Sequence, residues 1–244
     1  MRRSRDGQGQ QLLAQLKRGA PTAEIIERED GYIDTGSVPG SYFREYREWS
    51  PLEKRAIRAA NGRVLDVGCG AGRHALYLQQ QGLDVTGIDA SAGAVAVCKA
   101  RGLARVLLRP LGDVGKFAPS AFDTVLMLGN NFGLLGSFRR ARRLLREIHR
   151  ITSGNARIIA STRNPVKTTN PYHLQYQRWN RKRGRMPGQI RFRVRFETAI
   201  GPWMDYLFVS PQEMAEILNG TGWEIDKLLD AGGAEYFAVI RKAA

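Results

Sequence analysis

Short apolar runs alternate with helical patterns through the middle of the chain. Five apolar runs predict strands, at 63–67, 84–88, 106–108, 122–128 and 157–161. Amphipathic patterns between them predict helices, at 73–81, after Ser91 and at 138–150. This alternation is typical of a parallel sheet with helices on both of its faces.

The alternation stops after residue 161. Residues 162–209 show no helix–strand unit; they hold a loop with two prolines, an aromatic run PYHLQYQRWN, a basic loop RKRGRMPG and a strand QIRFRVRFE. Order resumes at Ser210-Pro211-Gln212-Glu213, a helix-capping box, which predicts a helix to Asn219 and closing strands at 223–228 and 235–241. The segment 162–209 therefore reads as an insertion into one α/β domain.

The N-terminal part reads as helical. Residues 1–30 predict one or two short polar helices, and Ser50-Pro51-Leu52-Glu53 begins a helix that runs to about Ala60. The aromatic stretch Tyr42 to Trp49 either covers a ligand site or packs on the sheet edge. The predicted organisation is a helical segment 1–61, a core 62–161, a basic and aromatic cap 162–209, and closing elements 210–244.

Composition is ordinary for a soluble globular protein. Of the 244 residues 43% are hydrophobic, and no run of 18 apolar residues occurs. Two cysteines do not suggest a disulfide framework, so we expect a reducing, cytoplasmic setting.

Positive charge is concentrated in one segment. The net charge is +15, and residues 139–196 hold 17 Arg or Lys against one acid, Glu147. Within the strand IRFRVRF, the side chains of Arg191, Arg193 and Arg195 share one face. That row either grips phosphates or carboxylates or is a solvated face.

A glycine-rich turn follows the first core strand. It reads Gly68-Cys69-Gly70-Ala71-Gly72, and its glycines let a ligand approach the backbone closely. A dinucleotide fingerprint requires a third glycine where Arg73 stands, which argues against a dinucleotide. The helix N-terminus beyond the turn favours a carboxylate or phosphate.

Three acids follow successive core strands at the edge where open α/β sheets bind ligands. They are Asp66, Asp89 and Asp113. A carboxylate at Asp89 can accept hydrogen bonds from both ribose hydroxyls, and Asp113 can receive the amino group of an adenine.

With these residues the sequence resembles the class I S-adenosylmethionine-dependent methyltransferases. The matching motifs are VLDVGCGAG, VTGIDAS, LGDV and FDTVLMLGN, in family order over about 63–161. The resemblance implies a Rossmann-like, doubly wound seven-stranded sheet, mostly parallel with an antiparallel end, plus a cap insertion after strand five. It implies S-adenosylmethionine as cofactor and no metal.

The resemblance also implies a set of cofactor-binding residues. Asp66 and the three glycines line the methionine end, Arg73 assists its carboxylate, and Asp89 holds the ribose. Asp113 and the backbone of Val114 hold the adenine, and Leu128 and Gly129 flank the methyl donor. The whole set is Asp66, Gly68, Cys69, Gly70, Gly72, Arg73, Asp89, Ala90, Asp113, Val114, Leu128 and Gly129.

The acceptor is less defined. The run GNNFG lacks the Asn-Pro-Pro-aromatic motif of base N-methylating enzymes, and Asn130 within it is either an acceptor contact or a turn residue. His173 is either a general base or a packing residue. The leading hypothesis is methyl transfer to a small molecule bound beneath the cap, and anionic molecules are among the candidate acceptors.

Two other functions stay open. In one, an RNA methyltransferase contacts phosphates through residues 178–195. In the other, the protein binds the cofactor without catalysis. The sequence leaves the accepting atom and the oligomeric state undetermined.

Overall fold

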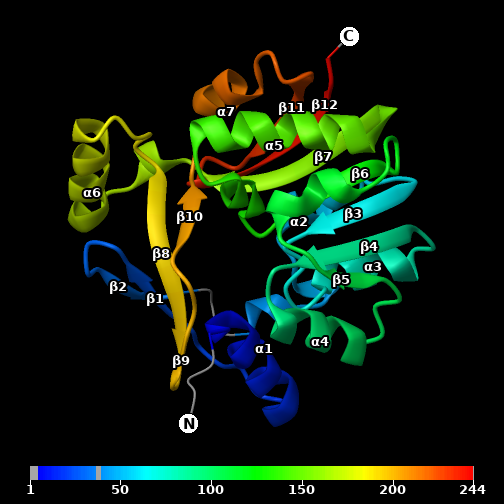
Figure 1. The fold of residues 1–244 in the computed structure, drawn as a ribbon, viewed down its shortest axis with the longest axis horizontal. Helices are drawn as coiled ribbons and strands as arrows, with labels where there is room; N and C mark the ends of the chain where they lie inside the picture. Colours follow the sequence, from blue (N-terminus) through cyan, green and yellow to red (C-terminus); the bar gives the residue numbers. More distant parts are fainter. Residues whose placement is uncertain (1–4, 37–39, 244) are drawn as a thin grey trace.

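The computed structural model describes residues 5–36 and 40–243 and contains a seven-stranded sheet with the order β11-β12-β7-β6-β3-β4-β5 (Figure 1). The strands are β3 (Arg63–Val67), β4 (Asp84–Asp89), β5 (Val106–Leu108), β6 (Phe122–Met127), β7 (Thr152–Arg163), β11 (Trp223–Asp230) and β12 (Glu235–Lys242). Strand β12 is antiparallel to both of its neighbours, and the others are parallel. The expected mostly parallel sheet with an antiparallel end is confirmed.

Helices cover both faces of this sheet. We call the sheet and these helices the core. They are α2 (Pro51–Ile57), α3 (Arg73–Gln80), α4 (Ala92–Ala100), α5 (Phe138–Ile151) and α7 (Pro211–Leu218). Strands β3, β4, β6 and β7 each place residues in two different apolar clusters; Ile158 packs in one and Ile159 in the other. The strands therefore read as continuous apolar runs, as expected for a sheet buried on both faces.

The helix starts follow the predicted capping chemistry. The hydroxyls of Ser50, Ser91 and Ser210 accept from backbone N–H groups at 3.1, 2.9 and 3.2 Å. Proline stands at the first position of α2 and α7, where its missing N–H has no helical partner to lose.

A second sheet forms a cap beside the core. Its order is β10-β8-β1-β2, and β9 pairs with β8. The strands are β1 (Ile25–Arg28), β2 (Ile33–Thr35), β8 (Gln189–Phe196), β9 (Ala199–Ile200) and β10 (Met204–Leu207). Because β1 pairs with β8, the N-terminal segment and the insertion build one structure.

The expectation of a helical segment 1–61 is therefore wrong in part. One helix, α1 (Gly7–Arg18), precedes the two strands. Strands β1 and β2 are short and largely polar, so the segment lacks a clear alternating pattern. Strand β1 is stabilised by pairing with β8, more than 160 residues away in sequence, and β2 pairs with β1; local patterns do not reveal the distant pairing.

The expectation that the insertion holds no helix–strand unit is also wrong, because α6 is followed by β8. The aromatic run forms α6 (Pro171–Lys182), with the Asn170 side chain accepting from the Tyr172 N–H at 2.9 Å. Its buried residues are Tyr176, Gln177 and Asn180, so two of the three are polar and the apolar stripe is weak. The sequence signal for this helix was Asn170 followed by Pro171, a favourable pair for a helix start.

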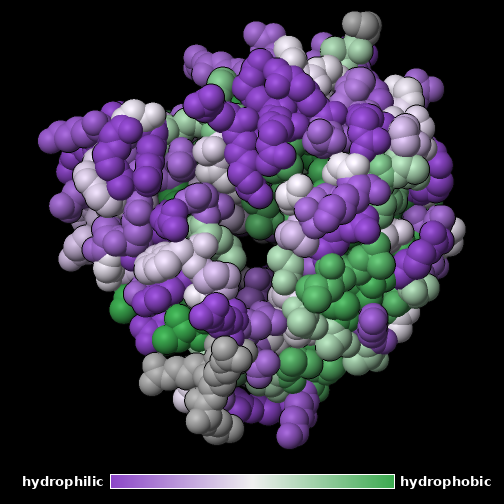
Figure 2. Space-filling view, in the orientation of Figure 1, coloured by the Kyte–Doolittle hydropathy of each residue, from purple (hydrophilic) through white to green (hydrophobic). Residues whose placement is uncertain are grey.

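Short 3₁₀ helices complete the connections: η1 (Ser41–Phe43), η2 (Tyr46–Glu48), η3 (Leu111–Lys116), η4 (Asn131–Leu135) and η5 (Pro165–Lys167). Figure 1 shows α1 between α4 of the core and the β8–β9 end of the cap. In Figure 2 the surface is hollowed between cap and core. Within the described ranges, no helix has the length and apolar character needed to cross a membrane.

Candidate cofactor and acceptor site

The glycine turn is held against the neighbouring strand. The N–H groups of Gly68 and Cys69 donate to the Ile88 carbonyl at 2.9 and 3.1 Å. Gly68, Gly70 and Gly72 have φ values of +68°, +57° and +78°. These are left-handed conformations that side chains disfavour, so the turn requires its glycines.

Asp89 joins the first two motifs. Its Oδ2 accepts from the Gly70 N–H and its Oδ1 from the Ser91 N–H, each at 2.9 Å. The carboxylate lies at the end of β4 and is buried, and burial raises its pKa. Each carboxylate oxygen has a further lone pair, so the geometry allows the ribose role that the resemblance implies. Ala90, which follows, is exposed.

Asp66 provides a test of whether the residues fit the cofactor. Its Oδ2 is buried and has no hydrogen-bond partner among the described residues. Burial, and then the charge of Asp89, raise the pKa of Asp66 to about 7. An ammonium group beside this oxygen would satisfy it, and the amino acid end of S-adenosylmethionine has one. The site fits the cofactor.

Cofactor affinity is therefore expected to depend on pH. Below pH 7 the Asp66 carboxyl of the free protein is protonated, and the neutral acid attracts an ammonium less strongly. Affinity for S-adenosylhomocysteine should rise about tenfold between pH 6 and pH 8, measured by calorimetry. Asp66→Asn should remove this rise. A rise that persists in Asp66→Asn would assign it to another group.

The same shift affects stability. Because the pKa of Asp66 is raised in the folded state, its favourable contribution is present at low pH and is lost as the pH rises through 7. The three histidines, whose pKa burial lowers, change stability in the opposite direction near pH 6, so the Asp66 effect is read as the difference between wild type and Asp66→Asn. Bound S-adenosylhomocysteine should suppress the loss, measured by thermal unfolding at pH 6 and pH 8.

Arg73 begins α3 and belongs to a buried cluster. Its Nη2 lies 2.6 Å from the Glu53 Oε1, and the His74 Nε2 lies 2.7 Å from the same oxygen. The ring of Trp49 packs against both Arg73 and His74. The charge of Arg73 also acts on Asp66, and its role at the methionine end stays a prediction. The sequence pattern indicates only a helix-start role for Glu53 and does not reveal its pairing with Arg73 and His74.

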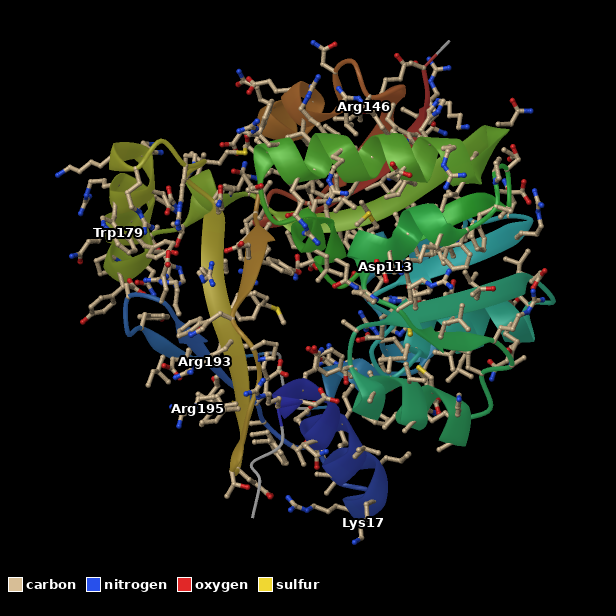
Figure 3. The ribbon with its side chains drawn as sticks, in the orientation of Figure 1. Lys17, Asp113, Arg146, Trp179, Arg193 and Arg195 are labelled. Atoms are coloured by element: carbon tan, nitrogen blue, oxygen red, sulfur yellow. The ribbon has the colours of Figure 1, made fainter. Side chains whose placement is uncertain are left out.

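The third motif lies in η3. Val114 is buried, whereas the Asp113 carboxylate is exposed and lies 2.8 Å from the Lys116 Nζ (Figure 3). An exposed carboxylate with a flexible lysine partner is available to a ligand. Its adenine role stays a prediction.

The end of β6 borders open space. Leu128 is buried, and Gly129 is exposed with a φ of +69°. A Cβ at Gly129 would meet no protein atom within 4 Å. This opening agrees with the expected position beside the methyl donor.

Asn130 is clamped by core and cap together. Its N–H donates to the Ser161 Oγ at 2.8 Å, and its carbonyl accepts from the Tyr206 hydroxyl at 2.5 Å. Its φ of +67° fits the turn-residue interpretation. Its side-chain Oδ1 is buried without a partner in the described structure, as the acceptor-contact interpretation requires. The two interpretations are compatible.

His173 lies on the cap. Its ring meets that of Tyr32 at 5.3 Å between centroids, and its Nδ1 is 3.4 Å from the Thr168 Oγ1. Burial, and then the charge of Arg28, lower the pKa of His173. A neutral imidazole suits a base, and that role stays a prediction.

The aromatic stretch covers the glycine turn at one end, and its other end packs on helix α3 rather than on the expected sheet edge. The Tyr42 ring lies 3.4 Å from where a Gly70 Cβ would stand, over the glycine turn. The ring of Tyr46 stacks on Tyr77 of α3 at 4.4 Å, and Trp49 packs on the same ring. One end of the stretch covers the turn and the other packs on the core.

The arginine row of β8 has acidic partners. Arg193 and Arg195 lie 2.7 and 3.1 Å from the carboxylate of Glu27 on β1, and Arg191 lies 3.6 Å from Asp205. Figure 3 shows Arg193 and Arg195 beside β1. The positive charge of the insertion is thus partly neutralised by Glu27 from outside it and by Asp205 from within it.

Known proteins resemble both the core and the whole chain. Residues 65–160 match the family model described as a methyltransferase domain. A glycine/sarcosine N-methyltransferase from Parasynechococcus marenigrum is 32% identical over 106 residues, which are 41% of this chain and 38% of that protein. The match therefore spans less than half of the curated relative.

Solved structures extend the similarity. A methyltransferase from Bacteroides fragilis, in complex with S-adenosyl-L-homocysteine, has a TM-score of 0.83 and 26% identity, and covers 100% of this chain and 98% of its own. A methyltransferase from Streptomyces caelestis has a TM-score of 0.58 and 18% identity, and covers 84% and 98%; it supports the fold alone. The chain therefore contains an S-adenosylmethionine-dependent methyltransferase domain, and S-adenosylmethionine is its cofactor.

Proposed function

We propose that the protein transfers a methyl group from S-adenosylmethionine to a small acceptor that carries an anionic group. The cofactor supplies a methyl group already activated on a sulfonium. The protein then has to align two reactants and exclude water, and alignment alone contributes about 7–11 kcal/mol. Cap and core enclose the hollow of Figure 2 for this purpose.

The observation on which this proposal rests is the Asn130 Oδ1, which is buried and has no hydrogen-bond partner among the described residues. A buried amide oxygen left unpaired is unfavourable by about 1–3 kcal/mol, so an acceptor that donates an N–H or O–H there gains affinity. Asn130 follows β6, the strand whose end borders open space at Gly129.

Arg163 supplies the complementary charge. It ends β7 two residues beyond Ser161, so its side chain starts from the same face as the hydroxyl that binds Asn130. Arg163 is exposed, and its charge acts on Glu235, its cross-strand neighbour on β12, without a direct ion pair among residues 5–36 and 40–243. A guanidinium in that position suits a carboxylate. Glycine and sarcosine, named in the matched relative, combine an amine with a carboxylate.

A labelled-methyl assay tests the acceptor class. The protein is incubated with methyl-labelled cofactor and glycine, sarcosine and other small amino acids, with the amide of each as a matched control. We expect label on carboxylate-bearing amines and at least about tenfold less on their amides. Equal labelling of acids and amides would contradict the anionic acceptor. Label in a nuclease-sensitive fraction of added RNA would instead support the RNA alternative.

A further inference from the structure

The carboxylate of Asp6 joins two helix N-termini that lie far apart in sequence. Its Oδ1 accepts from the Gly9 N–H of α1 at 2.9 Å. Its Oδ2 accepts from the Gly93 N–H of α4 and from the Ser91 hydroxyl, each at 2.9 Å. A carboxylate is favourable at the positive end of a helix, and this one lies at two such ends.

Ser91 extends this contact to the cofactor site. Its N–H donates to the Asp89 Oδ1, and its hydroxyl accepts from the Ala94 N–H, each at 2.9 Å. A chain of hydrogen bonds thus runs from Asp6 on α1, through Ser91, to the carboxylate assigned to the ribose. The turn formed by Asp89, Ala90 and Ser91 is held from the core by the Gly70 N–H and from α1 by Asp6.

The two helices approach closely enough to make this contact specific. A Cβ at Gly93 would lie 2.5 Å from the Gly9 Cα. On its other side α1 packs on the cap, where a Cβ at Gly7 would lie 2.3 Å from the Val194 carbonyl oxygen. Helix α1 is therefore a tightly fitted bridge between cap and core, as Figure 1 shows.

Asp6 and Asp89 also interact electrostatically. The charge of Asp6 contributes to the raised pKa of Asp89. Placing two carboxylates this close is unfavourable unless each is hydrogen-bonded, and here each accepts from backbone N–H groups. If Asp6 only capped α1, it would not need to lie beside the carboxylate of Asp89.

We propose that Asp6 is a positioning residue for the cofactor, which acts through Ser91 to hold the turn of Asp89 in the geometry that receives the ribose hydroxyls. This inference rests on the ribose role of Asp89. It extends the cofactor site to the N-terminal helix, which the sequence motifs do not include.

Binding measurements separate positioning from a purely structural role. Affinities of wild type and Asp6→Ala are measured by calorimetry for S-adenosylhomocysteine, and by competition for adenosine and 2′,3′-dideoxyadenosine. We expect Asp6→Ala to reduce the affinities for S-adenosylhomocysteine and for adenosine about tenfold each. The affinity for dideoxyadenosine should stay nearly unchanged. The proposal would be overturned if Asp6→Ala reduced the affinities for adenosine and dideoxyadenosine equally, or if it reduced neither affinity.

Two further variants keep the test informative if Asp6→Ala folds poorly. Gly93→Ala retains both carboxylates but forces α1 away, and should reproduce the loss of preference for adenosine over dideoxyadenosine. Glu197→Gln breaks the exposed Arg18–Glu197 pair, which ties α1 to the cap, and should leave the preference intact. A lost preference in Glu197→Gln would indicate a general loosening of α1 and would contradict the proposal.

Failure of the underlying assignment has a different signature. If Asp89→Asn keeps the full preference for adenosine over dideoxyadenosine, the ribose role of Asp89 is wrong. If Asp89→Asn loses the preference while Asp6→Ala and Gly93→Ala keep it, only the role of Asp6 is wrong.

Discussion

Replacing Asp89 by alanine is expected to reduce the affinity for S-adenosylhomocysteine by about 100-fold or more. The variant loses charge-assisted hydrogen bonds to the ribose, each worth about 1.5–3 kcal/mol. It also leaves the N–H groups of Gly70 and Ser91 without their acceptor, so the glycine turn loses one of its links to β4. Calorimetric titration of the purified variant measures the loss.

Asp84→Ala is the matched control. Asp84 lies at the opposite end of the same strand and forms an exposed pair with Arg105. Its removal should leave cofactor affinity within about twofold, because an exposed ion pair contributes only about 0–1 kcal/mol. Tight binding by Asp89→Ala, with normal thermal unfolding, would contradict the ribose assignment.

The core was predictable because its signals are local. Each strand from β3 to β7 lies near its predicted place because a buried parallel strand is a short apolar run bounded by turn residues. The helix starts at Ser50, Ser91 and Ser210 depend on side chains within three residues of the cap. The glycine turn likewise depends on backbone conformations that glycine favours.

The cap was not predictable in the same way, because its stability comes from distant partners. Glu27 and Glu29 resemble ordinary surface acids in the sequence, yet they bind Arg193, Arg195, Arg183 and Arg185 across the cap. The sequence counts show where charge is concentrated, but they do not show which acids will lie beside it. Strands β1 and β2 escaped prediction for the same reason.

The residues of the candidate site likewise fall into those that belong to local motifs and those that come from distant segments. Asp66, Asp89 and the glycines belong to contiguous motifs and lie together as expected. Asp6, Tyr42 and Tyr206 reach the site from segments without a motif. These residues reach the core through contacts between segments that are distant in sequence, such as α1 with α4.

Replacing Gly133 by alanine is expected to destabilise the protein by about 3 kcal/mol or more. A Cβ at this position would lie 2.0 Å from the Tyr206 Cε1 and 2.4 Å from two other ring atoms. The ring has little room to move, because Phe192 and Phe208 flank it and its hydroxyl donates to the Asn130 carbonyl. Thermal unfolding should shift down by about 6–12 °C.

A double variant assigns that loss to the ring. Tyr206→Ala alone should destabilise by about 3–5 kcal/mol, but in its background Gly133→Ala should add almost nothing, since the added methyl then enters the space that the ring has left. Gly154→Ala, at an exposed glycine whose added Cβ meets nothing within 4 Å, should change stability by less than about 0.5 kcal/mol. Additive effects of Gly133→Ala and Tyr206→Ala would contradict this packing. Because the same ring holds Asn130, Gly133→Ala should also slow methyl transfer to whichever acceptor the labelled assay identifies, even at temperatures where the variant is fully folded.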